Sequence, residues 1–196
     1  MQVDFAVELG RDDDVLDFPW ASPDGGSAYH DLKRHPELIL YIGEAHRVME
    51  LGQFLESLNS PDGLFETAKC DVWSSTHLNP EEKIFGAAFK FGSYVDLLFA
   101  SEVSRFSFPE HEGFVKRITE LLKRVPEIPA SAEFLVRRCY YRQEGTDARA
   151  GFYVTFYLFG YGDDEMSARR QWAIGMNLAD NALRQISASS ARAENA

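Results

Sequence analysis

The chain has 196 residues, 45% of them hydrophobic and 26% charged, a balance typical of a globular protein with a substantial core. Its net charge of −11 argues against a nucleic-acid partner, because affinity for phosphates comes mainly from clustered Lys and Arg. No apolar run approaches the roughly 20 residues that span a bilayer, and no signal-peptide pattern is present, so we expect a cytoplasmic protein without a membrane segment.

Hydrophobic periodicity and turn residues divide the chain into strands and helices. Alternating apolar positions predict strands, and apolar positions that recur every three or four residues predict helices. The predicted elements in chain order are a strand at 3–9, a loop at 19–30, a helix at 36–58 that can divide at Gly43, strands at 64–74, 83–92 and 95–100, a helix from Pro109, strands at 132–142 and 151–160 joined by a turn at 143–150, and a final helix that begins near Asp163 or Asp164.

The middle of the chain repeats the pattern of its start. The stretch VDLLFASEVSRFSFPE begins with Val-Asp and contains Phe-Pro, as does VDFAVELGRDDDVLDFPW at the N-terminus. In each half a cysteine is followed by a Phe-x-x-x-Phe pair. The first Phe of the pair lies 15 residues after Cys70 in one half and 13 residues after Cys139 in the other. We interpret the repeat as two βαββ units, and chance similarity between aromatic strands is the alternative.

These patterns predict an α+β fold in which an antiparallel sheet carries helices on one face. Two ferredoxin-like βαββ units side by side, followed by a C-terminal helix, would build such a sheet. The first unit would cover residues 1–94, with an inserted loop and helix, and the second residues 95–186, within one compact domain. The tail at 187–196 is small and polar, so we expect it to be disordered.

No familiar catalytic pattern occurs in the chain. The two cysteines are too few and too far apart for a disulfide framework, and the five histidines show no metal-ligand spacing. The run Asp12–Asp14 lacks the spaced pattern of a calcium loop, and no GxSxG or phosphate-binding glycine loop is present. We therefore expect no metal site and no cofactor, and we do not predict an enzyme.

Arginine and aromatic residues gather in the second strand pair and the helix after it. Guanidinium groups with aromatic rings are typical of protein interfaces and of sites for stacked or anionic ligands, although they also occur in ordinary half-buried sheets. The candidate binding residues are Arg137, Tyr140, Tyr153, Tyr157, Arg169 and Trp172.

Three functional hypotheses follow. The first is a binding module that recognises a protein partner, or a second copy of itself as a homodimer, through an aromatic sheet face or the acidic N-terminal third. Residues 1–66 hold 14 Asp and Glu against 4 Lys and Arg. The second is an enzyme or small-molecule-binding protein with Arg137, Tyr140, Tyr153 and Tyr157 lining a pocket between sheet and helices. The third is an antitoxin or immunity protein that binds a basic toxin.

Overall fold

A single mixed sheet organises the fold of the computed structural model, which describes residues 1–125, 127–142 and 147–194. Its strands are β1 (Gln2–Glu8), β2 (Val15–Phe18), β3 (Phe65–Ser75), β4 (Phe89–Phe99), β5 (Ala130–Tyr141) and β6 (Arg149–Gly162). The order across the sheet is β1-β5-β6-β4-β3, and β2 follows β1 along the outer edge of β5. Strands β3 to β6 pair antiparallel, as expected, whereas β1 and β2 run parallel to β5.

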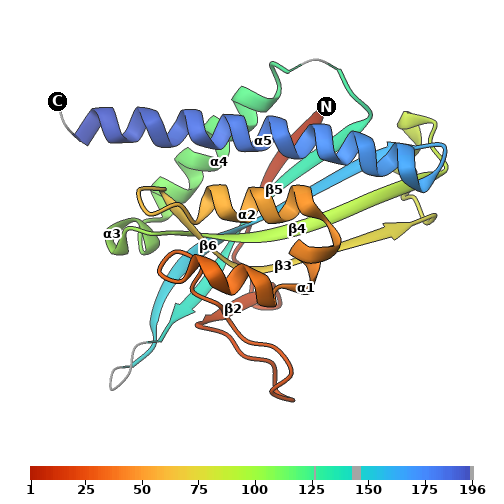
Figure 1. The fold of residues 1–196 in the computed structure, drawn as a ribbon. Helices are drawn as coiled ribbons and strands as arrows, with labels where there is room; N and C mark the ends of the chain where they lie inside the picture. Colours follow the sequence, from red (N-terminus) through yellow and green to blue (C-terminus); the bar gives the residue numbers. More distant parts are fainter. Residues whose placement is uncertain (126, 143–146, 195–196) are drawn as a thin grey trace.

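Three helices cover one face of this sheet, which confirms the predicted α+β class. Helix α5 packs against β4, β5 and β6, α4 against β1, β5 and β6, and α2 against β3 and α5. Helices α2 and α5 lie in front of the strands in Figure 1. The helical segments are η1 (Pro36–Tyr41), α1 (Gly43–Arg47), α2 (Met49–Leu58), η2 (Pro80–Phe85), α3 (Glu102–Arg105), α4 (Phe108–Leu122) and α5 (Glu165–Glu194).

The main core lies between the sheet and these helices. Trp172 of α5 is fully buried there, and its indole Nε1 donates a hydrogen bond to Ser93 Oγ at 2.9 Å. Gly160 of β6 allows this close approach, because a Cβ atom at that position would lie 2.1 Å from the Trp172 backbone nitrogen. The face of the sheet toward the helices is therefore packed with side chains rather than hollowed into a pocket.

The ferredoxin-like repeat is not supported by the arrangement of the strands. The boundary proposed between residues 94 and 95 falls inside the continuous strand β4. The two cysteine-bearing strands are not equivalent either, because β3 is an edge strand and β5 an interior one. Cys70 packs against the main core, whereas Cys139 belongs to a second hydrophobic cluster. The repeated sequence pattern therefore reflects similar composition in strands that occupy different places.

Several elements differ from the sequence prediction. Residues 80–85 form η2 instead of the start of a strand, because Pro80 and the left-handed Gly86 favour a tight helical turn there. Strand β2 was not predicted, and α5 continues through Glu194 where we expected disorder, since the alanine-rich tail has no helix-breaking residue. Residues 143–146 of the predicted turn and 195–196 of the tail lie outside the described residues.

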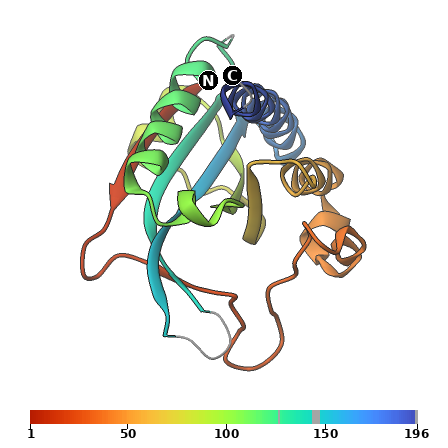
Figure 2. The ribbon, with the colours of Figure 1, turned by 90° about the vertical axis from the view of Figure 1, so that its left-hand side faces the viewer.

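The segment between β2 and η1 passes along one end of the sheet as a long loop (Figure 2). It is held by Trp20, whose indole Nε1 donates to the Ala68 carbonyl oxygen at 2.8 Å, and by Tyr29, whose ring contacts Phe18 edge-on. No helix within the described ranges is both long and apolar enough to cross a membrane.

Candidate functional site

The candidate site is the face of the sheet opposite α2, α4 and α5, which we call the open face. Its two ends are closed by other parts of the chain. At one end, the second hydrophobic cluster, which includes Leu16, Phe18 and Tyr141, packs under the loop after β2 and under Phe106 beyond α3. At the other end, η2 lies against the sheet, where Phe85 stacks on Tyr161 with ring centroids 4.2 Å apart. The middle of the face lies between these two closed ends.

Four aromatic rings from three neighbouring strands meet in this middle region. We call Trp73, Tyr94, Tyr157 and Phe159 the ring array, and each of its side chains is half-buried. Ring centroids are 5.9 Å apart for Trp73 and Phe159, 5.9 Å for Tyr94 and Tyr157, and 6.3 Å for the stacked Tyr157 and Phe159. Gly92 forms the floor between Trp73 and Phe159, because a Cβ atom there would lie 2.9 Å from both rings.

This position of Gly92 corrects a sequence expectation. Gly86, Ala88, Lys90 and Gly92 share one face of the predicted strand at 83–92, a pattern that predicts a close neighbour there, more often a packed helix than a ligand. In the structure the rings of Trp73 and Phe159, which are its register neighbours on β3 and β6, cover Gly92 instead. The missing side chain thus allows two large rings to approach each other on the open face.

A network of hydrogen-bonded and charged side chains lies beside the ring array. Thr155 Oγ1 donates to Asp96 Oδ1 at 2.8 Å and accepts a longer hydrogen bond of 3.4 Å from Arg137 Nη1. Arg137 Nε in turn donates to Glu8 Oε2 at 2.7 Å, and its Nη1 lies 3.5 Å from Asp14 Oδ2. The guanidinium is therefore already satisfied by carboxylates of the same chain and is not a free anion site.

Two carboxyl groups of the open face have raised pKa values. Burial raises the pKa of Asp96 to about 6, and the hydrogen bond from Thr155 and the charges of Lys69 and Arg137 oppose that rise. The pKa of Glu133 is raised by burial and by the neighbouring carboxylates Glu8 and Asp4. Both groups sit where an additional positive charge would be stabilising.

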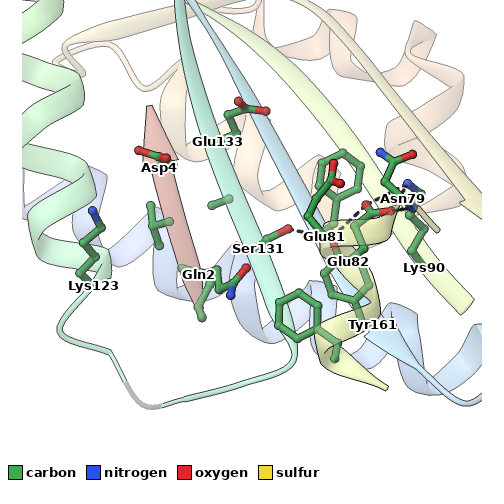
Figure 3. A pocket seen from close by; sticks show the side chains of 15 residues that line it. Gln2, Asp4, Asn79, Glu81, Glu82, Lys90, Lys123, Ser131, Glu133 and Tyr161 are labelled. Carbon is green, nitrogen blue, oxygen red and sulfur yellow. Dashed lines mark hydrogen bonds and ion pairs between the residues drawn. The ribbon is translucent and has the colours of Figure 1, made fainter. Parts of the chain in front are cut away.

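A cavity of about 630 Å³ opens between η2 and the strands β1, β5 and β6 (Figure 3). Its wall at η2 is rigid, since Glu82 accepts hydrogen bonds from Lys90 at 2.9 Å and from the Tyr161 hydroxyl at 3.1 Å. Burial acts to raise the pKa of the Glu82 carboxyl group, but the hydrogen bonds from Lys90, the Asn79 amide and Tyr161, together with the charge of Lys90, outweigh burial and the pKa is lowered. Asp4 and Glu133 reach the cavity from β1 and β5.

The structure brings together three of the six residues predicted from sequence. Arg137, Tyr153 and Tyr157 all lie on the open face, where the Arg137 guanidinium carbon is 6.0 Å from the Tyr157 ring centroid. Tyr153 is buried in the second hydrophobic cluster at the edge of the middle region. These residues therefore line the open face, and not a pocket between the sheet and the helices.

The other three predicted residues lie elsewhere. Trp172 is fully buried in the main core, so it contributes to packing and is not available to a partner. Arg169 of α5 pairs with Glu50 of α2 at 3.2 Å and is on the helix side. Tyr140 points to the opposite face from Arg137 and is 40% exposed.

Sequence reasoning missed Asp96, Thr155, Glu133 and every ring-array member except Tyr157. Their meeting depends on the pairing of distant strands, which composition does not reveal. One signal was available, because Asp96 is a charged residue within the apolar run of 95–99.

The geometry offers little support for catalysis. Burial raises the pKa of both cysteine thiols to about 12, so neither is a ready nucleophile. His111 is fully buried, and burial lowers the pKa of its imidazole. Among the described residues, no group of three or more His, Cys, Asp and Glu could hold a metal ion.

Comparisons with known proteins identify no relative: no family model, no curated protein and no solved structure matches the chain. The functional argument therefore depends on the geometry of the open face alone.

Proposed function

We propose that this protein is a binding module that recognises a protein partner through the open face of its sheet. The ring array carries the proposal. Four half-buried aromatic side chains lie next to one another on a sheet face that α2, α4 and α5 leave uncovered, and such rings are enriched at protein interfaces. Their large rigid surfaces gain burial on binding with little loss of side-chain freedom.

The closed ends of the open face support the same proposal. Both the loop after β2 and η2 are fastened to the sheet by hydrogen bonds and ring stacking, so the middle region has fixed borders. A pre-formed surface loses less conformational entropy on binding than a loop that must become ordered. We place this activity in the cytoplasm, a proposal with which the two free thiols are consistent.

Selection from a displayed random-peptide library tests the proposal. We expect peptides enriched on the wild-type protein to lose binding to the double variant Trp73→Ala, Tyr157→Ala, because it removes two rings of the array. The matched control is Tyr140→Ala, which removes an exposed ring from the other face of the same sheet. Peptides that bind the double variant and the wild type equally well would contradict the proposal.

A small-molecule ligand or substrate is the second candidate, and the cavity beside η2 favours it. Its volume of about 630 Å³ lies within the usual range for ligand pockets. A thermal-shift screen against metabolites, nucleotides and divalent metals tests this candidate. A ligand that raises the melting temperature of the wild type, but not of Ser131→Ala or Glu133→Gln, would favour it over the protein-partner proposal.

A further inference from the structure

One line of side chains crosses the open face from edge to edge. In the strand register, Asp4 of β1 pairs with Glu133 of β5, Glu133 with Tyr157 of β6, Tyr157 with Tyr94 of β4, and Tyr94 with Asp71 of β3. We call these five residues the cross-strand row. Since neighbouring strands are about 4.8 Å apart, the row spans about 19 Å. Carboxylates stand at both ends and tyrosine rings in the middle.

The carboxylates of the row lack partners of opposite charge. Asp4, Asp71 and Glu133 are exposed, and none of them forms an ion pair with another described residue. Asp4 and Glu133 are moreover direct neighbours of like charge, which is an unfavourable arrangement in a sheet. A cation placed between them would relieve this repulsion.

Two basic residues of the open face are held by other carboxylates of the chain, and a third contacts an aromatic ring. Arg137 is held by Glu8 and Asp14, and Lys90 is held by Glu82. Lys69 lies over the Trp20 ring, with its Nζ 5.0 Å from the ring centroid. The surface along the row is therefore predominantly acidic and aromatic, with Lys123 and Met1 also lining the cavity at its β1 end.

The cavity beside η2 provides a place for one cationic side chain at the β1 end of the row. Asp4, Glu81 and Glu133 line it together with the Phe159 ring, and Figure 3 shows these three carboxylates around the opening. A lysine or arginine head group could pair with these carboxylates while its stem packs on the ring. Asp71 offers a second acidic contact at the β3 end.

The negative charge of the cross-strand row distinguishes between the classes of molecule that could bind there. A second copy of the chain would bring the same acidic face against itself, and a nucleic acid would bring phosphates toward unpaired carboxylates. We infer that the occupant is an extended, basic segment of a partner protein, which lies along the cross-strand row with a lysine or arginine at each end. This inference rests on the proposed binding function and specifies the chemistry of the partner.

The length of the row sets the spacing of the two basic residues. An extended peptide rises about 3.3 Å per residue, so two side chains about 19 Å apart are about six residues apart in sequence. The middle of such a segment would lie over Tyr94 and Tyr157, where apolar or aromatic side chains and guanidinium groups all bind favourably. Two adjacent arginines could not reach both ends.

Calorimetric titration with synthetic peptides tests the inference. The probe is an extended peptide with two arginines about six residues apart, on the basis of that rise, and with no other charged side chain. One control peptide has glutamate in place of both arginines, and a second has the arginines adjacent. We expect binding of the spaced-arginine peptide, roughly tenfold weaker binding of the adjacent-arginine peptide, and no binding of the glutamate peptide.

Charge-neutralising variants separate a specific site from general attraction by an acidic protein. We expect the double variant Asp71→Asn, Glu133→Gln to weaken the binding of the spaced-arginine peptide by roughly tenfold or more. The control is Glu56→Gln with Glu120→Gln, which changes the net charge equally at exposed positions of α2 and α4. Equal losses in both double variants, or no binding of the spaced-arginine peptide, would overturn the inference.

Two further outcomes would overturn the inference of a basic partner segment, and each would point to a different function. Library peptides that depend on Trp73 and Tyr157 but carry no excess of Lys and Arg would keep the binding function and exclude a basic partner. A dimer seen by light scattering, and lost in the Asp71→Asn, Glu133→Gln variant, would make a second copy the occupant.

Discussion

The two faces of the sheet differ in chemistry although the same strands build both. On the helix side, side chains such as Phe134 and Phe156 stack with centroids 4.8 Å apart beneath α5 and are fully buried. On the open side, the adjacent residues Glu133 and Tyr157 remain accessible. The first face is what an isolated domain needs in order to fold, whereas folding alone gives no reason for a second face with both aromatic rings and unpaired carboxylates. The difference supports the proposal that the open face binds a partner.

The largest effect expected from this comparison is that of Gly160→Ala on the helix side. A Cβ atom at Gly160 would lie 2.1 Å from the Trp172 nitrogen and 2.3 Å from the Ala168 carbonyl oxygen. Because both neighbours are backbone atoms of α5, we expect a loss of roughly 4 kcal/mol or more in the free energy of unfolding, or failure to fold. Chemical denaturation measures the loss. A change of less than about 1 kcal/mol would show that α5 does not pack as described.

The two tryptophans on opposite faces form a matched pair. Trp172→Ala should lower the free energy of unfolding by about 3–5 kcal/mol, because it leaves a cavity in the main core. Trp73→Ala should cost only about 1 kcal/mol, because the ring is half-buried and its loss opens no enclosed cavity. Urea denaturation of both variants gives the two values, and equal costs would contradict the assignment of Trp73 to a binding face.

Ionisation of the buried Asp96 lowers the free energy of unfolding as the pH rises, and the variant Asp96→Asn should remove this pH dependence. Its folded pKa of about 6 lies above the ordinary value of 3.8, so the folded state binds more protons between these values and stability falls as pH rises through them. The variant keeps an acceptor for Thr155. Between pH 4 and pH 7.5 we expect the wild type to lose about 2–3 kcal/mol more than the variant does.

Parallel denaturation curves of wild type and Asp96→Asn at the two pH values test this expectation. The difference between the two proteins isolates Asp96, since His111 and the other titrating groups are common to both. A difference that stays constant with pH would show that Asp96 is ionised as easily as a surface carboxylate.

Gly92→Ala should have only a small effect on stability, in contrast to Gly160→Ala. Its Cβ atom would meet the rings of Phe159 and Trp73 at 2.9 Å, but these half-buried side chains can move outward. We expect a cost of about 1 kcal/mol in the free energy of unfolding, together with weaker peptide binding because the rings are displaced. Calorimetric titration of selected library peptides measures the second effect. An unchanged affinity would show that the ring array is not part of the binding surface.

The sequence predicted elements better than it predicted their pairing. The alternation of Val3, Phe5 and Val7 predicted β1. The helix predicted from Pro109, with Ser107 or Phe108 as its cap, is α4, and in the structure Ser107 Oγ accepts a hydrogen bond from the Glu110 amide. The parallel pairing of β1 with β5 is absent from local patterns, because it joins segments that are distant in sequence. Register decides which side chains meet, so the cross-strand row could not be predicted.

Gly92 and Ser93 show how a local rule can fail for a reason that only tertiary structure provides. The sequence pattern predicted two separate strands here, at 83–92 and 95–100. In the structure both residues are in the middle of β4, where Gly92 lies beneath two rings and Ser93 accepts the hydrogen bond of Trp172. Arg137 and Tyr157, in contrast, were candidates from composition alone. The structure shows that both lie on the open face, and their role in binding stays a prediction.

The tryptophan indole N–H resonances test the central claim, that the open face is the binding surface, most directly. Trp73 is on the open face and Trp172 is buried on the helix side, so single Trp→Phe variants can assign each signal. In a titration of the 15N-labelled protein with a library-selected peptide, we expect the Trp73 indole signal to shift progressively and the Trp172 signal to stay in place. A shift of the Trp172 signal with no change at Trp73 would contradict the claim.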